Sequence, residues 1–180
     1  MRIFIAVNFP EDVKDALCGD MAGLRERSVT GNFSLRENLH LTLAFLGEVH
    51  PRRVMDIRRV MDSVICPASD AGISGFGSFG RGDERLLWRG LRLDPKVRAM
   101  RDRLISGLKE AGFTPDDKPF KPHITIARRA CYPPEFSEKD FASSLSDIPF
   151  RIEAISLMRS ERIGGRLTYT EMYRASLPQE

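Results

Sequence analysis

The chain has 180 residues, of which 42% are hydrophobic and 29% are charged, and its formal net charge is +3 at pH 7. These values indicate a globular protein long enough for a substantial apolar core, and they exclude a membrane-spanning class, since no stretch approaches the roughly 20 apolar residues that a span needs. Cys18, Cys66 and Cys131 are odd in number and far apart, which argues against a disulfide framework and a zinc site.

The first part of the chain predicts strand, helix, strand and helix. Residues 2–8 alternate and run into Pro10-Glu11-Asp12 without a small-residue cleavage site, so they indicate a strand rather than a signal peptide, and we expect a cytoplasmic protein. A helix opens at these acidic residues. A polar turn at 30–32 and a short segment at 33–35 then lead to a strand ended by Gly47. A second helix runs from Pro51 to Pro67. The helical stripes are Val13, Leu17, Met21 and Leu24, followed by Val54, Ile57, Met61, Val64 and Ile65.

The second part begins with a predicted hairpin. Residues 71–79 and 85–93 have strand character and are joined by Gly80-Arg81-Gly82-Asp83. A third helix runs from Asp94-Pro95 to Gly112, and residues 113–122 lead into another strand. The remaining elements are a short helix at 137–145, a strand at 150–158, a turn at Gly164-Gly165 and a strand at 167–175.

These elements form a duplication. Strand, Pro-started helix, loop, strand and shorter helix occur over residues 2–65 and again over 85–145, and 36 positions separate both Phe4 from His40 and Leu87 from His123. The pattern predicts an α+β fold of two antiparallel sheets with outer helices and a pseudo-two-fold internal duplication. We expect residues 1–180 to form a single domain of two interleaved lobes without a linker.

One motif occurs in both repeats. His40-Leu41-Thr42-Leu43 and His123-Ile124-Thr125-Ile126 each lie in an apolar, alternating run, and the chain has three histidines in all. Successive side chains on a strand point to opposite faces, so each His shares a face with the Thr two residues on. The repetition predicts one bipartite site, with the two motif strands facing each other across a cleft.

Two facing imidazoles can divide acid and base work near neutral pH, while the two Thr hydroxyls can hydrogen-bond an oxyanion. Basic residues near the motifs favour an anionic ligand, and phosphoester cleavage is the natural fit. No Asp, Glu, Cys or third His stands at ligand spacing beside either motif, so we expect metal-free catalysis without a cofactor. The basic residues in question are Arg36, Lys118, Lys121, Arg128 and Arg129.

Aromatic residues near the motifs are candidates for base stacking. Phe33 and Phe120 lie in loop-like approaches to the two motifs, which favours a stacking role. Phe45 and Trp88 lie within predicted strands, and we expect them to pack in the core. The Gly75-Phe76-Gly77-Ser78-Phe79-Gly80 segment matches a dinucleotide-binding pattern, but a strand follows it where such a site needs a helix.

The chain resembles the RNA 2′,3′-cyclic phosphodiesterase family, also called 2′-5′ RNA ligase-like proteins, of the 2H phosphoesterase superfamily. The resemblance covers nearly the whole chain and rests on both tetrads and their flanks. These flanks are the opening strand from Met1 to Ala6, the run from Glu37 to Gly47, the run from Pro119 to Arg128, and Ser160-Glu161.

This resemblance implies a bilobal fold and metal-independent hydrolysis of RNA 2′,3′-cyclic phosphate ends to 2′-phosphomonoesters. By position, His40 would donate a proton to the leaving 3′ oxygen and His123 would activate water. Thr42 and Thr125 would hold non-bridging oxygens, and Arg128 would bind phosphate. In reverse, the same groups could join a cyclic end to a 5′-hydroxyl. The predicted substrate contacts are Arg128, Phe33, Phe120 and Lys121.

The expected partners are RNA ends or oligonucleotides that carry a 2′,3′-cyclic phosphate, bound by a monomer. Two alternatives stay open at this point. The groove could belong to a non-catalytic nucleotide- or RNA-binding module, although binding alone does not require two proton-transfer groups. The chain could also be an enzyme of the same superfamily that acts on a small cyclic nucleotide.

Overall fold

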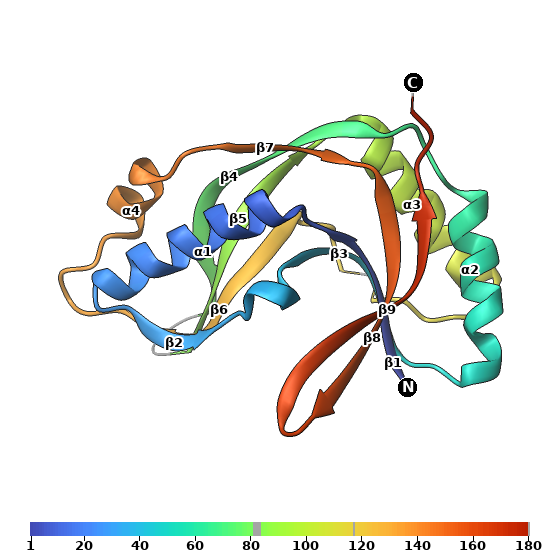
Figure 1. The fold of residues 1–180 in the computed structure, drawn as a ribbon, viewed down its shortest axis with the longest axis horizontal. Coiled ribbons are helices and arrows are strands. Elements are labelled where there is room, and N and C mark those ends of the chain that lie inside the picture. The colour runs from blue at the N-terminus through green and yellow to red at the C-terminus, as the bar shows by residue number, and fades with distance from the viewer. Residues whose placement is uncertain (81–83, 117, 180) are drawn as a thin grey trace.

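The strands of the protein form two antiparallel sheets with helices packed on them (Figure 1). The computed structural model describes residues 1–80, 84–116 and 118–179. The first sheet has the order β3-β1-β8-β9 and the second the order β2-β6-β5-β4-β7. The strands are β1 (Arg2–Asn8), β2 (Thr30–Phe33), β3 (His40–Glu48), β4 (Ser69–Phe79), β5 (Arg85–Leu93), β6 (His123–Cys131), β7 (Ile148–Ile152), β8 (Ala154–Ile163) and β9 (Arg166–Ser176). The α-helices are α1 (Glu11–Glu26), α2 (Val54–Ser63), α3 (Pro95–Glu110) and α4 (Glu138–Ser144).

The two halves of the chain follow the same element order and exchange strands. β1, α1, β3 and α2 of the first half correspond to β5, α3, β6 and α4 of the second, and β1 pairs with β3 as β5 pairs with β6. After α2 the chain enters the second sheet as β4, beside β5. After β7 it returns to the first sheet as β8, beside β1. The predicted fold class of two antiparallel sheets with helices is therefore confirmed, and each half completes the sheet of the other.

The helices follow the predicted apolar stripes. All four stripe residues of α1 are buried. α3 begins where the Asp94 side chain accepts a hydrogen bond from the Lys96 amide at 2.7 Å, and it is followed by Gly112 with φ of +80°. The second helix differs from its prediction, because residues 51–53 form a 3₁₀ turn, α2 ends at Ser63, and Ile65 is exposed. No helix in the described part is long and apolar enough to cross a membrane.

The predicted turn at 30–32 is wrong. These residues belong to β2, which pairs with the far end of β6 at the edge of the second sheet. Most of this strand is exposed, so its polar side chains carry no apolar alternation that could identify it. Sheet pairing, which is not local in sequence, makes it a strand.

The single strand predicted over 150–158 is two strands in different sheets. β7 pairs with β4 in the second sheet, β8 pairs with β1 in the first, and Glu153 lies between them. The prediction failed because the alternating residues of β7 run into the buried residues of β8 with one residue between them, and both patterns are typical of strands. Neither pattern reveals that the partner strand changes at Glu153.

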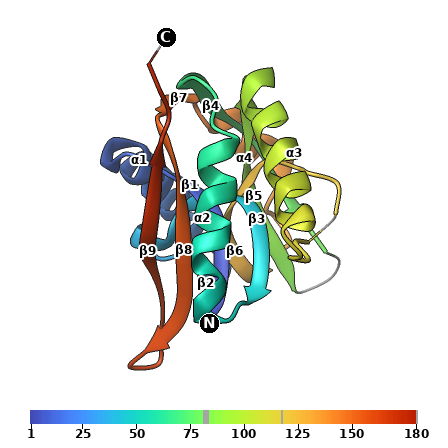
Figure 2. The same cartoon turned by 90° about the vertical axis from the view of Figure 1, so that its right-hand side faces the viewer.

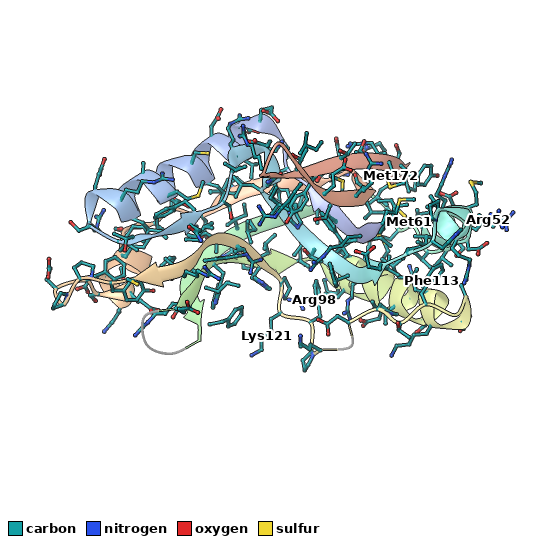
Figure 3. All side chains as sticks on the ribbon, turned by 90° about the horizontal axis from the view of Figure 1, so that it is seen from below. Arg52, Met61, Arg98, Phe113, Lys121 and Met172 are labelled. Atoms are coloured by element: carbon teal, nitrogen blue, oxygen red, sulfur yellow. The ribbon has the colours of Figure 1, made fainter. Side chains whose placement is uncertain are left out.

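Two hairpins are confirmed. β4 and β5 pair with each other, and residues 81–83 of the predicted turn between them lie outside the described residues. β8 and β9 pair through the turn at Gly164 and Gly165, whose φ values of +57° and +81° suit glycine. The tip of this second hairpin extends beyond the body of the molecule (Figure 2). Its other end packs near α2, and Met61 of α2 and Met172 of β9 lie at that end (Figure 3).

A buried ion pair joins the two halves. Arg89 on β5 is fully buried, and its guanidinium bonds to the carboxylate of Asp20 on α1 and to the Ser146 carbonyl oxygen at 2.9 Å. Burial raises the pKa of the Asp20 carboxyl, and the charge of Arg89 opposes that rise. The pair therefore ties the helix of the first repeat to a strand of the second repeat.

Replacing Arg89 by Ala should lower the free energy of unfolding by about 3–5 kcal/mol, because the Asp20 charge would remain buried without its partner. Urea denaturation followed by circular dichroism measures this loss. The matched control is Arg92→Ala on the same strand, which removes an exposed ion pair with Asp147 and should cost no more than about 1 kcal/mol. Equal losses in the two variants would contradict a special role for the buried pair.

Candidate active site

A groove of about 1030 Å³ brings the two motifs together. His40 and Thr42 reach it from β3 of the first sheet, and His123 and Thr125 reach it from β6 of the second. β3 and β6 are in contact where the sheets meet, and they run from the centre toward opposite ends of the molecule (Figure 1). The pseudo-symmetry of the chain thus produces a site with two similar walls.

Both imidazoles are held in the same way. Nδ1 of His40 lies 2.7 Å from the Asn38 carbonyl oxygen, and Nδ1 of His123 lies 2.7 Å from the Lys121 carbonyl oxygen. A carbonyl can only accept, so each Nδ1 carries a hydrogen and donates it. Each ring is therefore fixed in a tautomer that leaves Nε2 available for proton transfer.

The immediate surroundings of the two rings differ. Nε2 of His40 lies 3.0 Å from the Thr42 hydroxyl, which donates to it when the ring is neutral. The His40 ring packs between Phe4, at 4.9 Å between ring centroids, and the edge-on ring of Tyr169, at 5.2 Å. His123 has the edge-on ring of Phe79 at 5.2 Å. Among the residues that the structure describes, the edge-on ring is thus a phenol beside His40 and a phenyl ring beside His123.

Burial lowers the pKa of His40, and the charges of Arg128 and His123 lower it further. The hydrogen bond to the Asn38 carbonyl acts in the opposite direction and is the smaller effect. Burial also raises the pKa of Tyr169. At neutral pH, His40 is therefore uncharged in the free protein.

Each motif strand contains a bulge directly after the Thr. Thr42 pairs with Ala6 and Ala44 with Ile5, which leaves Leu43 as an extra residue. Thr125 pairs with Trp88 and Ala127 with Leu87, which leaves Ile126 as an extra residue. The bulge shifts the alternation by one position, because two residues then oppose one.

The shift decides which side chain follows the Thr into the groove. Simple alternation would place Ala44 and Ala127 on the face of the histidines. Instead both alanines are buried in the core, and Phe45 and Arg128 line the groove at equivalent positions of the two repeats. Equivalent positions of the two repeats therefore bring a phenyl ring from β3 and a guanidinium from β6 into the groove.

Among the predicted substrate contacts, the structure brings Arg128 and Phe33 into the groove. The guanidinium carbon of Arg25 lies 4.1 Å from the Phe33 ring centroid. The groove lining does not include Phe120 or Lys121. Phe120 packs against the core with Arg101 over its ring, because it sits in the segment that follows α3. Lys121 is exposed and supports His123 through its backbone carbonyl, while its side chain points outward (Figure 3).

Sequence reasoning missed several groove residues. Phe45 lines the groove instead of packing wholly in the core, and the guanidinium carbon of Arg2 lies 5.0 Å from its ring centroid. Tyr169 and Arg162 come from the β8–β9 hairpin, more than a hundred positions after His40. Alternation in the last strand signals that Leu167 and Tyr169 share a face, but it does not indicate which site that face meets.

The structure describes no group of three or more His, Cys, Asp or Glu side chains arranged to hold a metal ion within residues 1–80, 84–116 and 118–179. The chemical groups that the groove presents are two imidazoles, a phenol, four aliphatic hydroxyls that include those of Thr42 and Thr125, two carboxylates, two side-chain amides and several guanidiniums. This set suits proton transfer to and from an anionic ligand.

Comparisons with known proteins agree with this arrangement. The RNA 2′,3′-cyclic phosphodiesterase of Thermotoga maritima is 31% identical over 176 residues, which cover 94% of this chain and 89% of that protein. The Thermus thermophilus protein of the same name is 32% identical over 192 residues, which cover 100% of this chain and 92% of that protein. The crystal structure of E. coli LigT complexed with 3′-AMP superposes on this structure with a TM-score of 0.80 at 26% sequence identity. The superposition covers 99% of this chain and 98% of the LigT chain. A family model described as the 2′-5′ RNA ligase superfamily matches residues 13–164, and the chain belongs to this superfamily.

Proposed function

We propose that this protein hydrolyses 2′,3′-cyclic phosphate ends of RNA to 2′-phosphomonoesters by two-histidine acid–base catalysis. The observation that carries the proposal is the matched anchoring of His40 and His123, each with Nδ1 on a backbone carbonyl two residues earlier and both lining one groove. The names of the relatives support the substrate class.

In the proposed reaction, Nε2 of His123 takes a proton from water as the water oxygen bonds to phosphorus. The bond from phosphorus to the 3′ oxygen breaks, and Nε2 of His40 gives that oxygen a proton, which leaves a 2′-phosphate and a 3′-hydroxyl. The hydroxyls of Thr42 and Thr125 and the charge of Arg128 stabilise the non-bridging oxygens in the transition state. No resident metal or cofactor takes part in this scheme.

Two observations support the order of the roles. The anchoring contact of His123 is exposed, which suits a base that must reach water, whereas that of His40 is partly buried. The enclosed His40 is neutral in the free protein, and a bound phosphate anion within a few ångströms favours its protonated form. Binding of the substrate thus charges the proton donor.

A 5′-hydroxyl in place of water would form a bond to phosphorus as the bond to the 3′ oxygen breaks, which gives a 2′-5′ phosphodiester by the same proton transfers. The proposal therefore includes 2′-5′ ligation as the same displacement with a different nucleophile. We further propose that the protein acts as a monomer in the cytoplasm. RNA ends and oligonucleotides with a 2′,3′-cyclic phosphate are the proposed partners.

His40→Ala and His123→Ala should each lower kcat/KM on a 2′,3′-cyclic oligonucleotide by about 10²- to 10⁴-fold, because each removes one proton transfer. Product analysis should find a 2′-phosphate, and activity should persist in EDTA. A Lys118→Ala control, which changes an exposed residue outside the groove, should leave the rate within twofold. Activity that requires an added divalent metal would contradict the metal-free scheme. Histidine variants with unchanged turnover would favour a non-catalytic binding module.

The pH dependence tests the roles. A proton donor must be protonated, so kcat/KM should fall as the pH rises through the pKa of free His40, which lies below 6.5. The basic limb of kcat should lie at higher pH, because kcat reports the complex, in which the phosphate raises that pKa. The measurement is a pair of bell-shaped profiles, whose limbs belong to the coupled pair. A kcat/KM that is constant from about pH 5 to 9 would exclude two-histidine catalysis.

A further inference from the structure

We propose that the β8–β9 hairpin and the start of β1 form a binding track for the RNA chain on the 5′ side of the cyclic phosphate. The track is defined by Arg2, Ser160, Arg162, Leu167 and Tyr169. It makes an oligonucleotide, rather than a cyclic mononucleotide, the preferred substrate. This inference rests on the proposed function, because it assigns the chain that carries the reacting end.

The track residues are neighbours on one face of the first sheet. Arg2 pairs with Ser160, Ser160 with Tyr169, and Arg162 with Leu167. Arg162 lies two positions beyond Ser160, which is about 7 Å along the strand and on the same face. All five residues line the groove. The track therefore leads from the Tyr169 ring, which touches His40, to the tip of the hairpin.

The balance of charge in the groove favours a ligand with several phosphates. The two carboxylates in its lining are already paired, Glu48 with the N-terminal ammonium at 3.1 Å and Glu161 with Arg159 at 2.6 Å. In contrast, the structure gives no carboxylate partner to Arg2, Arg128 or Arg162 within the residues it describes. These three guanidiniums leave the groove with uncompensated positive charge.

One guanidinium is enough for the reacting phosphate. Arg128 is the one whose charge acts on His40, so it lies beside the acid–base pair. Arg2 and Arg162 remain, and both belong to the track. A cyclic mononucleotide carries no further phosphate for them, whereas an oligonucleotide carries one at each upstream position.

The proposed reaction also predicts the direction in which the RNA chain runs along the track. His40 donates to the 3′ oxygen, so the ribose must lie on the His40 side of the phosphorus, against the first sheet. The RNA chain leaves that ribose through its 5′ oxygen, and the track is the surface that continues from His40 on this sheet.

The tip of the hairpin provides apolar surface beside the positively charged side chains of the track. Leu167, which pairs with Arg162, is 37% exposed, and the tip projects beyond the rest of the molecule (Figures 1 and 2). Arg162 donates a hydrogen bond to the Gly165 carbonyl at 2.8 Å but has no carboxylate partner in the described residues. An exposed apolar side chain beside such a guanidinium suits single-stranded RNA, whose phosphates need cations and whose unstacked bases need apolar contacts.

The test compares substrates of increasing length. The value of kcat/KM is measured for a 2′,3′-cyclic mononucleotide, a trinucleotide and a hexanucleotide with the same terminal base. The wild-type value should rise at least fivefold with length. Arg162→Gln should lower the ratio of hexanucleotide to mononucleotide values five- to tenfold, because it removes one upstream phosphate contact. It should also reduce the dependence of log(kcat/KM) on log salt for the hexanucleotide by about 0.7.

Arg52→Gln is the matched control, since it removes the same charge from an exposed residue at the end of the molecule where α2 begins (Figure 3). It should keep the wild-type length ratio and salt slope. The proposed track would be wrong if the wild-type enzyme hydrolysed all three substrates equally well. It would also be wrong if the Arg162→Gln variant kept the wild-type ratio of hexanucleotide to mononucleotide kcat/KM. If the wild type hydrolyses none of the three, the proposed function itself fails.

Discussion

Hydrogen bonding between strands of opposite halves is the constraint on which the rest of the structure depends. β4 of the first half completes the sheet of β5, and β8 of the second half completes the sheet of β1. Neither repeat can bury its apolar face alone, so the two sheets must lie together. This arrangement brings β3 and β6 into contact. The buried ion pair between Arg89 on β5 and Asp20 on α1 also joins the two halves. The groove is a consequence of the strand exchange.

The two repeats share the contacts that hold the histidines and differ in the residues that surround them. Both histidines use Nδ1 on a carbonyl two residues earlier, and both strands bulge directly after the Thr. The residue that each bulge exposes is Phe45 in one repeat and Arg128 in the other. The edge-on ring against each histidine is Tyr169 in one repeat and Phe79 in the other, and His40 also contacts Phe4. In the proposed function, the separate acid and base roles of the two histidines follow from these different neighbours on otherwise similar strands.

The β8–β9 hairpin connects the chemistry to recognition. Tyr169 encloses His40, and burial there lowers the pKa of the imidazole. The same hairpin is held to the segment before His40 by Arg166 with Glu37 and by the Asn38 side chain on the Leu167 carbonyl at 2.9 Å. Asn38 also carries the carbonyl that fixes His40, so one residue connects the hairpin to the proposed proton donor.

Patterns in the sequence already predicted the motif strands, the buried stripe of α1, and the shared face of each His and its Thr. These features are local, since side-chain periodicity reports which face of an element is buried. The tertiary structure decided that residues 30–33 are an edge strand, that residues 150–158 divide between two sheets, and that Arg128 rather than Ala127 enters the groove. It also placed Phe120 in the core region and supplied Tyr169, Arg2 and Arg162. Strand pairing and bulges depend on a partner strand distant in sequence, so no local pattern encodes them.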